Sequence, residues 1–414
     1  MKVGATSTIG EVTSIVTKGT TPTTLGRQFV SHGIGFIKAE CISNDGALIV
    51  EKQVYIDEET DQLLKRSRLQ KDDVLFSIAG VIGRTAIVQQ SALPANTNQA
   101  IAILRPDPKL ITPKFLYYSV RAKEFQDHSL GHVVQTAQAN VSLGVLTAAP
   151  IWLPPLATQH RIAGILSAYD ELIENSQQRI KILESMARAL YREWFVYLRF
   201  PGHESVPLVP SALGDIPQGW EVKRIDEAFQ TVLGGTPSRT NTEFWDGGSI
   251  PWINSGKVND LRITEASEMI TSLALERSAA KLMPLGTTVL AITGATLGQV
   301  SYLEIETTAN QSVVGIMDPT GELSEWVYLM ISDRIESIIN HASGGAQQHI
   351  NKENVNSVQV SIPSRSLSSD FKAVVSPMFR EIATLLFQIQ NLRRTRDLLL
   401  PRLLSGQINV EDAA

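Results

Sequence analysis

The stretch "LPPLATQHRIAGIL" (153–166) places two prolines directly before a helical pattern of apolar residues, near the middle of the chain. A similar junction, "IPSRSLSSDFKAVV" (362–375), occurs again close to the C-terminus. At an offset of 209 residues, Pro154 aligns with Pro363. The chain therefore contains one kind of junction twice, which indicates an internal repeat.

After each junction, apolar residues recur in alternating steps of four and three. The first series is Ile162, Leu166, Tyr169, Ile173, Ser176, Ile180, Leu183, Ala187, Leu190 and Trp194. The second series is Phe371, Val375, Met378, Ile382, Leu385, Ile389, Leu392, Arg396, Leu399 and Leu403. Ser176 and Arg396 are the only polar members. This spacing is typical of a coiled-coil seam, and it continues beyond the three or four turns of an ordinary amphipathic core helix.

Each series predicts a long helix, of about 38 residues and roughly 57 Å at 1.5 Å per residue. Two such helices in one chain most economically bury their apolar stripes against each other, so we predict an intramolecular antiparallel pair with the globular units at its opposite ends. Pro377 is expected to kink the second helix or to delay its first turn. Pro201-Gly202 and Gly406 are expected to close the two helices.

The segments that precede the helices also match each other. "IGEVTSIVTKGTTP" (9–22) resembles "IDEAFQTVLGGTPS" (225–238), and "NQAIAIL" (98–104) parallels "NQSVVGIM" (310–317). Short β-rich runs between Gly, Asn and Thr predict strands and turns. The predicted fold class is α+β, with two similar mixed α/β domains separated by two long helices that form an antiparallel coiled coil, a pseudo-two-fold internal repeat.

The predicted boundaries follow from this plan. They are a first globular domain at 1–156, a central long helix at 157–200, a proline-rich linker at 201–220, a second globular domain at 221–364 and a C-terminal long helix at 365–414.

The composition of the 414 residues is that of an ordinary globular protein, 43% hydrophobic and 19% charged. No run of 18 apolar residues predicts a membrane span, and the first residues lack the apolar core of a signal peptide. A single cysteine, Cys41, favours a reducing compartment, so we expect a cytoplasmic protein. The net charge of −5 means that any nucleic-acid surface is local or is completed by a partner.

The motifs of DNA methylation and nucleotide chemistry are missing. The Pro-Pro pair at 154–155 follows Leu153 where an adenine methyltransferase would have Asn, and Cys41 follows Glu40 where a cytosine methyltransferase would have Pro. "NSGKV" (254–258) lacks both the earlier glycine and the final Ser or Thr of a P-loop. The seven histidines form no HExxH motif. We therefore predict no catalytic residue, no metal site and no cofactor in this chain.

An ordered set of motifs resembles the specificity subunit of type I restriction-modification systems, over essentially the whole chain. These motifs are "LPPLATQHRIAGILSAYDELI" (153–173), "GDIPQGWEVKRIDEAF" (214–229), "GGTPSRTNTEFWDGGSIPWINSGKV" (234–258), "TGATLG" (293–298), "ANQSVVGI" (309–316) and "GGAQQHI" (344–350).

The resemblance implies a non-catalytic subunit whose globular domains are target recognition domains, each reading one half of a split sequence in double-stranded DNA. It implies that the paired helices measure the spacer and dock two methyltransferase subunits, which restriction subunits then join. S-adenosylmethionine, ATP and magnesium are accordingly expected in the partner subunits, and no membrane is expected.

Base reading requires Arg, Lys, Asn, Gln, Ser or Thr side chains that can reach the groove edges. The predicted DNA-binding residues of the first domain are Thr20, Thr21, Arg27, Lys38, Arg84, Asn98, Gln135 and Gln138. Those of the second domain are Ser238, Arg239, Asn241, Asn254, Ser255, Lys257, Gln347, Gln348 and His349.

Two other functions stay open at this point. One is a self-sufficient restriction or modification enzyme, which the missing catalytic motifs disfavour. The other is a structural coiled-coil adaptor without a DNA role, which leaves the two polar-loop globular domains unexplained.

Overall fold

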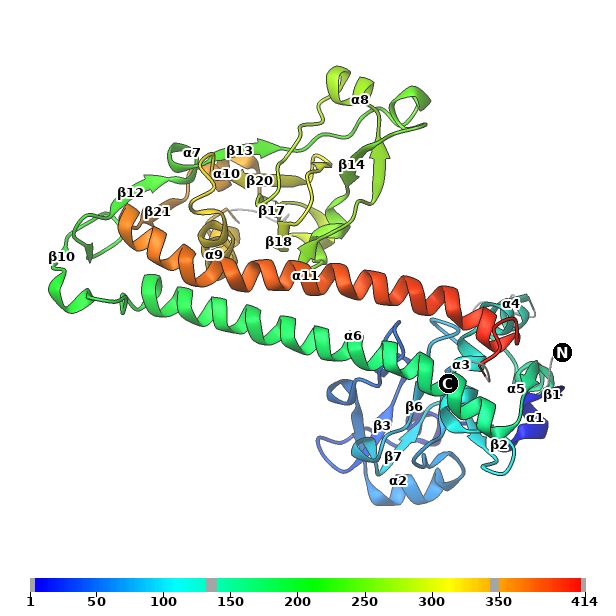
Figure 1. Ribbon diagram of the computed structural model, residues 1–414. Helices are drawn as coiled ribbons and strands as arrows, with labels where there is room; N and C mark the ends of the chain where they lie inside the picture. The colour runs from blue at the N-terminus through cyan, green and yellow to red at the C-terminus, as the bar shows by residue number, and fades with distance from the viewer. Residues whose placement is uncertain (1–3, 132–139, 343–349, 411–414) are drawn as a thin grey trace. The chain divides into compact units, whose positions relative to one another are not determined.

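The computed structural model describes residues 4–131, 140–342 and 350–410 (Figure 1). The chain forms two compact units, which are Met1–Ile173 with Asn391–Ala414 (unit 1) and Glu174–Gln390 (unit 2). The two long helices are α6 (Leu156–Tyr191) and α11 (Arg365–Leu404). Unit 1 includes the start of α6, up to Ile173, and the end of α11, from Asn391, and unit 2 includes the rest of both helices.

The globular part of unit 1 contains two sheets and a strand pair. The antiparallel sheet has the order β2 (Thr13–Lys18), β8 (Ile101–Pro106), β5 (Val74–Ser77) and β6 (Thr85–Ile87). The second sheet has β4 (Val54–Ile56), β3 (Ile34–Ile37) and β7 (Ala95–Thr97), and β1 (Ala5–Thr8) pairs with β9 (Pro150–Leu153). The helices are α1 (Ile9–Val12), α2 (Glu58–Leu63), α3 (Pro113–Arg121), α4 (Lys123–Gly131) and α5 (Leu143–Ala148).

The globular part of unit 2 has the same kinds of elements. One sheet has the order β13 (Gln230–Leu233), β20 (Val313–Met317), β17 (Thr288–Ala291), β18 (Val300–Leu303) and β15 (Arg262–Ile263). The second has β16 (Glu268–Ile270), β14 (Ile250–Ile253) and β19 (Thr308–Ala309), and β12 (Glu221–Arg224) pairs with β21 (Gln359–Ile362). The helices are α7 (Ile225–Ala228), α8 (Ser272–Arg277), α9 (Ser324–Ala342) and α10 (Lys352–Asn356).

The two globular parts share one topology. In the larger sheet of unit 1, β2 pairs with β8, β8 pairs with β5, and β5 forms a hairpin with β6. In unit 2 the strands β13, β20, β17 and β18 pair in the same order. In each smaller sheet the central strand has one antiparallel and one parallel neighbour. Strand β15 is an addition of unit 2, and α9 is continuous where unit 1 has α3 and α4. The predicted α+β internal repeat is confirmed.

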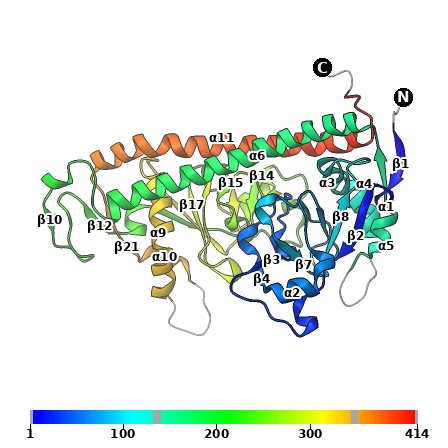
Figure 2. The ribbon, with the colours of Figure 1, turned by 90° about the horizontal axis from the view of Figure 1, so that it is seen from below.

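The long helices pair in an antiparallel manner within each unit (Figures 1 and 2). In unit 1, Ile162 and Leu166 of α6 share a core cluster with Leu403 of α11. In unit 2, Ala187 of α6 shares a cluster with Phe371 of α11. Within unit 1, Asp170 lies further along α6 and pairs with Arg396, which precedes Leu403 in α11. Within unit 2, Arg179 precedes Ala187 and pairs with Glu381, which follows Phe371, so the helices are antiparallel in each unit. Full burial of a side chain such as Leu contributes about 1.5–3 kcal/mol, so the apolar stripes supply the energy of pairing.

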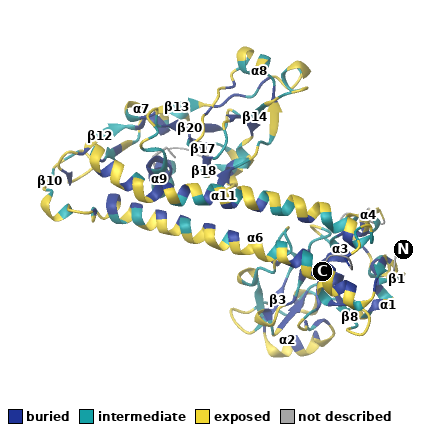
Figure 3. Cartoon of the chain, in the orientation of Figure 1, coloured by how far each residue is buried: buried dark blue, intermediate teal, exposed yellow. Residues whose placement is uncertain are grey.

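The predicted seam positions are buried or partly buried on both helices, and Figure 3 shows buried and exposed residues interspersed along α6 and α11. The buried ones are Ile162, Leu166, Ile173, Ile180, Ile382, Leu385 and Ile389. The partly buried ones are Tyr169, Leu183, Leu190, Met378, Leu392 and Leu399. The two polar exceptions, Ser176 and Arg396, are buried as well.

The ends of the helices differ in part from the prediction. Helix α6 ends at Tyr191, before the expected Pro201-Gly202, because a π-helical turn (Arg192–Val196) follows and Leu198 takes the left-handed conformation. This turn places Trp194 and Phe195 in the core of unit 2. Helix α11 is followed by Gly406, whose φ of 68° allows the chain to turn away as expected.

The expected delay at Pro377 is wrong. Helix α11 begins at Arg365 and includes Pro377, which is exposed. The neighbouring Val375 and Phe379 are buried in the core of unit 2, and this packing holds the helix although the proline supplies no N–H.

The segment 201–220 has structure of its own. It contains the short strand pair β10 (Leu208–Val209) and β11 (Ile216–Pro217). Its last residue, Trp220, packs against Phe195 and Phe200, with ring centroids 5.8 and 5.9 Å apart. The segment is therefore joined to the core of unit 2.

Candidate nucleic-acid interface

Four strands of unit 1 end at one edge of its globular part. The last residues of β2 and β5 pair with Ala102 and Ile101, at the start of β8. The parallel strands β3 and β7 also end together. The Gly19 N–H donates to the Asn98 carbonyl at 3.1 Å, which joins two of the loops that leave this edge. We call these loops the first loop edge, consisting of residues 19–33, 38–53, 78–84 and 98–100.

Unit 2 repeats this arrangement. The last residues of β13 and β17 pair with Val314 and Val313, at the start of β20, and β14 and β19 are parallel. The Gly235 N–H donates to the Ala309 carbonyl at 2.8 Å. The second loop edge consists of residues 234–249, 254–261, 292–299 and 310–312.

Every predicted DNA-binding residue that the structure describes lies in one of these loops. The first loop edge contains Thr20, Thr21, Arg27, Lys38, Arg84 and Asn98. The second contains Ser238, Arg239, Asn241, Asn254, Ser255 and Lys257. The remaining five (Gln135, Gln138, Gln347, Gln348 and His349) lie outside the described residues.

Three asparagines of the predicted set shape the loops. Asn98 Oδ1 accepts from the Ala100 N–H at 3.1 Å. Asn241 and Asn254 cap short 3₁₀ helices, each accepting a backbone N–H at 3.2 Å. Their side-chain oxygens are therefore committed to local turns, as is usual for Asn in loops.

Most of the predicted cationic residues are paired with acidic residues of their own domain. Arg239 donates to Glu268 at 2.6 and 2.7 Å, and this bond holds the pKa of Glu268 below its ordinary value. Arg27 forms a two-bond pair with Glu59. Lys257 lies 2.8 Å from Glu265, and Lys38 lies 3.6 Å from Glu40. Ion pairs that remain in contact with solvent contribute only about 0–1 kcal/mol, so a DNA phosphate competes with the bound carboxylate at these cations.

Arg84 differs from these cations. Its guanidinium donates to Asn44 Oδ1 at 2.8 Å and to the Ile42 carbonyl at 3.2 Å. Both acceptors are neutral, so these bonds orient the side chain and leave its positive charge uncompensated.

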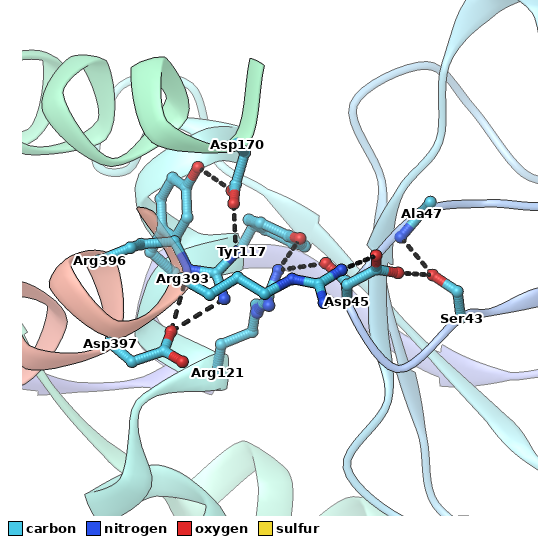
Figure 4. A network of polar contacts seen from close by, with 10 residues as sticks. Ser43, Asp45, Ala47, Tyr117, Arg121, Asp170, Arg393, Arg396 and Asp397 are labelled. Atoms are coloured by element: carbon cyan, nitrogen blue, oxygen red, sulfur yellow. Dashed lines mark hydrogen bonds and ion pairs between the residues drawn. The ribbon is translucent and has the colours of Figure 1, made fainter. Parts of the chain in front are cut away.

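The helix pair is tied to the first globular part by a polar network (Figure 4). Asp170 of α6 accepts from Arg396 of α11 at 2.5 Å and from the Tyr118 hydroxyl of α3 at 2.6 Å. Burial, together with Asp170, raises the pKa of Tyr118, so this hydroxyl remains a donor. Arg393, also on α11, donates at 3.3 Å to Asp45, which lies in a loop of the first loop edge. Arg396, a polar exception of the seam pattern, is thus an anchor between α6, α11 and α3.

Unit 2 has its own anchor, centred on Arg262 of β15. The Arg262 side chain is fully buried and lies against Glu184 of α6 and, at 3.4 Å, Glu304. Its guanidinium carbon lies 3.9 Å from the ring centre of Phe379 in α11. Cation–π contact and two carboxylates together compensate the buried charge.

Within the described parts of the chain, no group of three or more His, Cys, Asp or Glu side chains could hold a metal ion. In the same ranges, no helix combines the length and apolar character needed to cross a bilayer.

Sequence reasoning missed Gln99 and Gln311, which are exposed and lie at equivalent places in the two loop edges. Each contacts a threonine of the neighbouring loop, Thr21 and Thr236 respectively. The signal that could have found them is the dipeptide Asn-Gln, which occurs at 98–99 and again at 310–311.

Comparison with known proteins gives one consistent result. The family model described as type I restriction modification DNA specificity domain matches residues 4–185 and 217–367. The MjaIX specificity subunit of a type I restriction enzyme from Methanocaldococcus jannaschii is 25% identical over 413 residues, covering 98% of this chain and 92% of that protein. The HindI specificity subunit from Haemophilus influenzae is 23% identical, covering 83% and 88%.

Among solved structures, the S subunit of a type I restriction-modification system from M. genitalium has a similar fold. The TM-score is 0.59 at 16% identity, with 97% of this chain and 96% of that chain covered.

Proposed function

The chain belongs to the family of type I restriction modification DNA specificity domains, and on this premise we propose that it reads a bipartite DNA target, with one recognition domain for each half. The first recognition domain is the globular part of unit 1, and the second is that of unit 2. The observation that carries the proposal is the repeated topology, which brings polar loops together at one loop edge in each domain. A pair of equivalent readers fits a target of two half-sites.

The chain itself is a non-catalytic component. Specificity subunits select the DNA, so the transfer of methyl groups and the cleavage of DNA belong to other subunits. We propose that S-adenosylmethionine, ATP and magnesium bind to those partners, and that the complex works in the cytoplasm.

We propose that two methyltransferase subunits dock on the exposed sides of α6 and α11, and that restriction subunits join this core. Support comes from large apolar side chains that the helices leave exposed. Ile182 and Met186, one turn apart on α6 in unit 2, are 59% and 49% exposed. Leu172 and Leu398, in unit 1, are 55% and 57% exposed. Large apolar side chains that stay exposed next to each other, as Ile182 and Met186 do on α6, favour a protein partner.

The docking proposal is tested by a charge placed on this surface. Ile182→Glu with Met186→Glu should abolish co-purification with the methyltransferase partner, because burying two carboxylates in an interface is costly. Leu285→Glu is the matched control, since Leu285 is 63% exposed in the second recognition domain. Equal loss of the partner in both variants would contradict the proposed surface.

The DNA function is tested by methylation mapping. We expect the purified chain with S-adenosylmethionine and DNA to transfer no methyl group. With its methyltransferase partner it should direct methylation to one split sequence. Methyl transfer by the chain alone would favour the self-sufficient enzyme, and methylation that is independent of this chain would favour the structural adaptor.

A further inference from the structure

One side-chain contact occurs in both loop edges. Gln99 Oε1 accepts from the backbone N–H of Thr21 at 3.1 Å and also from the Thr21 hydroxyl. Gln311 Oε1 accepts from the Thr236 hydroxyl at 2.5 Å. The threonines follow the equivalent strands β2 and β13, and the glutamines follow β7 and β19. The contact is therefore part of the repeat, and the pairs Thr-Pro (21–22 and 236–237) and Asn-Gln (98–99 and 310–311) occur in both halves.

The contact fixes which way the Gln99 amide points. A backbone N–H can only donate, so the Gln99 atom that faces Thr21 must be the oxygen. The Nε2 group, with its two N–H donors, then lies on the opposite side of the amide. Gln311 has the same arrangement, with Oε1 turned to the Thr236 hydroxyl, and both glutamines are exposed residues.

This arrangement disfavours base reading by Gln99. A glutamine that recognises adenine uses its oxygen and its nitrogen together, accepting from N6 and donating to N7. Both lone pairs of Gln99 Oε1 are already engaged by Thr21. The Gln99 amide can therefore offer DNA only its Nε2 donors, and these suit a phosphate oxygen. Phosphates are also the same at both half-sites, as a contact shared by both domains requires.

We propose that Gln99 and Gln311 donate from Nε2 to DNA phosphates, one in each half-site, and that Thr21 and Thr236 are positioning residues that hold the two amides for this contact. The inference rests on the proposed DNA function. It reassigns Thr21, which the sequence suggested as a DNA contact, to the support of another side chain. A neutral donor adds a phosphate contact without adding positive charge to a chain of net charge −5.

The test uses the complete complex of this chain with its methyltransferase partner, and two duplexes, the mapped target and a scrambled one. Gln99→Ala should weaken binding to both duplexes about tenfold, as expected for loss of one hydrogen bond to a charged group, and leave their affinity ratio unchanged. Gln99→Lys should place a cation at the phosphate. The plot of log affinity against log salt should then become steeper by about 0.9, with the methylated sequence unchanged.

The positioning role is tested by two substitutions of Thr21. Thr21→Ser keeps the hydroxyl and should bind like the unmodified complex, whereas Thr21→Val should lose affinity for both duplexes. Thr21→Val combined with Gln99→Ala should be no weaker than Gln99→Ala alone, because both act on one contact. Thr23→Val is the matched control, since Thr23 is exposed in the same loop.

A methylated sequence that changes in Gln99→Lys would show base reading and overturn the inference. Unchanged affinity and salt dependence in all Gln99 variants would overturn it as well, with the DNA function intact. Failure of the unmodified complex to bind either duplex would contradict the proposed function itself, and this inference with it.

Discussion

Arg262, on β15 of the second recognition domain, lies fully buried against Glu184 of α6. The arginine comes from the DNA-reading domain and the glutamate from the long helix, so the pair joins the two parts of unit 2 through their charges. In unit 1 the Tyr118 hydroxyl of α3 links the globular part to Asp170 of α6, and Asp170 also pairs with Arg396 of α11.

Replacement of Arg262 should destabilise unit 2 strongly. Arg262→Leu leaves Glu184 and Glu304 without their shared partner in a buried site, which costs about 3–5 kcal/mol. Arg179→Ala, which breaks the exposed pair with Glu381, should cost less than about 1 kcal/mol. Amide hydrogen exchange of unit 2 measures the loss of stability in each variant. Equal protection in the two variants would mean that the Arg262 anchor contributes little.

The same site predicts a dependence on pH. Burial raises the pKa of Glu304 above its ordinary value, although Arg262 acts in the opposite direction. A carboxyl whose pKa is higher in the folded state binds more protons there, so its contribution to stability falls as the pH rises above about 4.5. Glu304→Gln should remove the part of the fall in stability with rising pH that comes from Glu304. Unfolding of both proteins from pH 4 to 7 measures it, and identical pH profiles would contradict the prediction.

Arg84 should contribute more to the electrostatic part of DNA binding than Arg239. The Arg84 guanidinium is held by neutral acceptors, whereas Arg239 must release Glu268 before it can bind a phosphate. Arg84→Gln should therefore lower the salt slope of binding by about 0.9, and Arg239→Gln should lower it by less. Titrations of the complex at several salt concentrations decide this. A larger effect of Arg239→Gln would show that its pairing with Glu268 does not restrain it.

The length of the helices should set the spacer of the target. Seven residues inserted into α6 after Ile173 and seven into α11 after Gln390 preserve the heptad pattern and lengthen each helix by about 10.5 Å. At 3.4 Å per base pair, the spacer between the half-sites should grow by about three base pairs. Methylation mapping reads the spacer directly, and an unchanged spacer would argue against the helices as a ruler.

The repeated fold was predictable because period and spacing are local properties of the sequence. The steps of four and three identified the helices α6 and α11, and the duplicated Gly-Thr and Asn-Gln segments identified equivalent strands. The effect of Pro377 was not predictable in this way, because the packing of Val375 and Phe379 in the core decides it.

The contacts between distant segments were also beyond the sequence. In the sequence, Arg396 is a polar residue that interrupts an apolar stripe, and only the fold shows that it pairs with Asp170. Gln159 of the first junction is fully buried and bonds to Thr112, Leu110 and Pro154, whereas Ser368, at the equivalent place in the repeat, bonds to Ser364 of its own junction. In the loop edges, a side chain's role depends on its partner, as Thr21 and Gln99 show.

The most direct test of the account replaces the first recognition domain with that of a related specificity subunit and maps the methylated sites of the resulting complex. If each domain reads one half of the target, one half-site should change to that of the donor, while the other half-site and the spacer stay the same. A target that changes in both halves, or in neither, would contradict the assignment of one domain to each half.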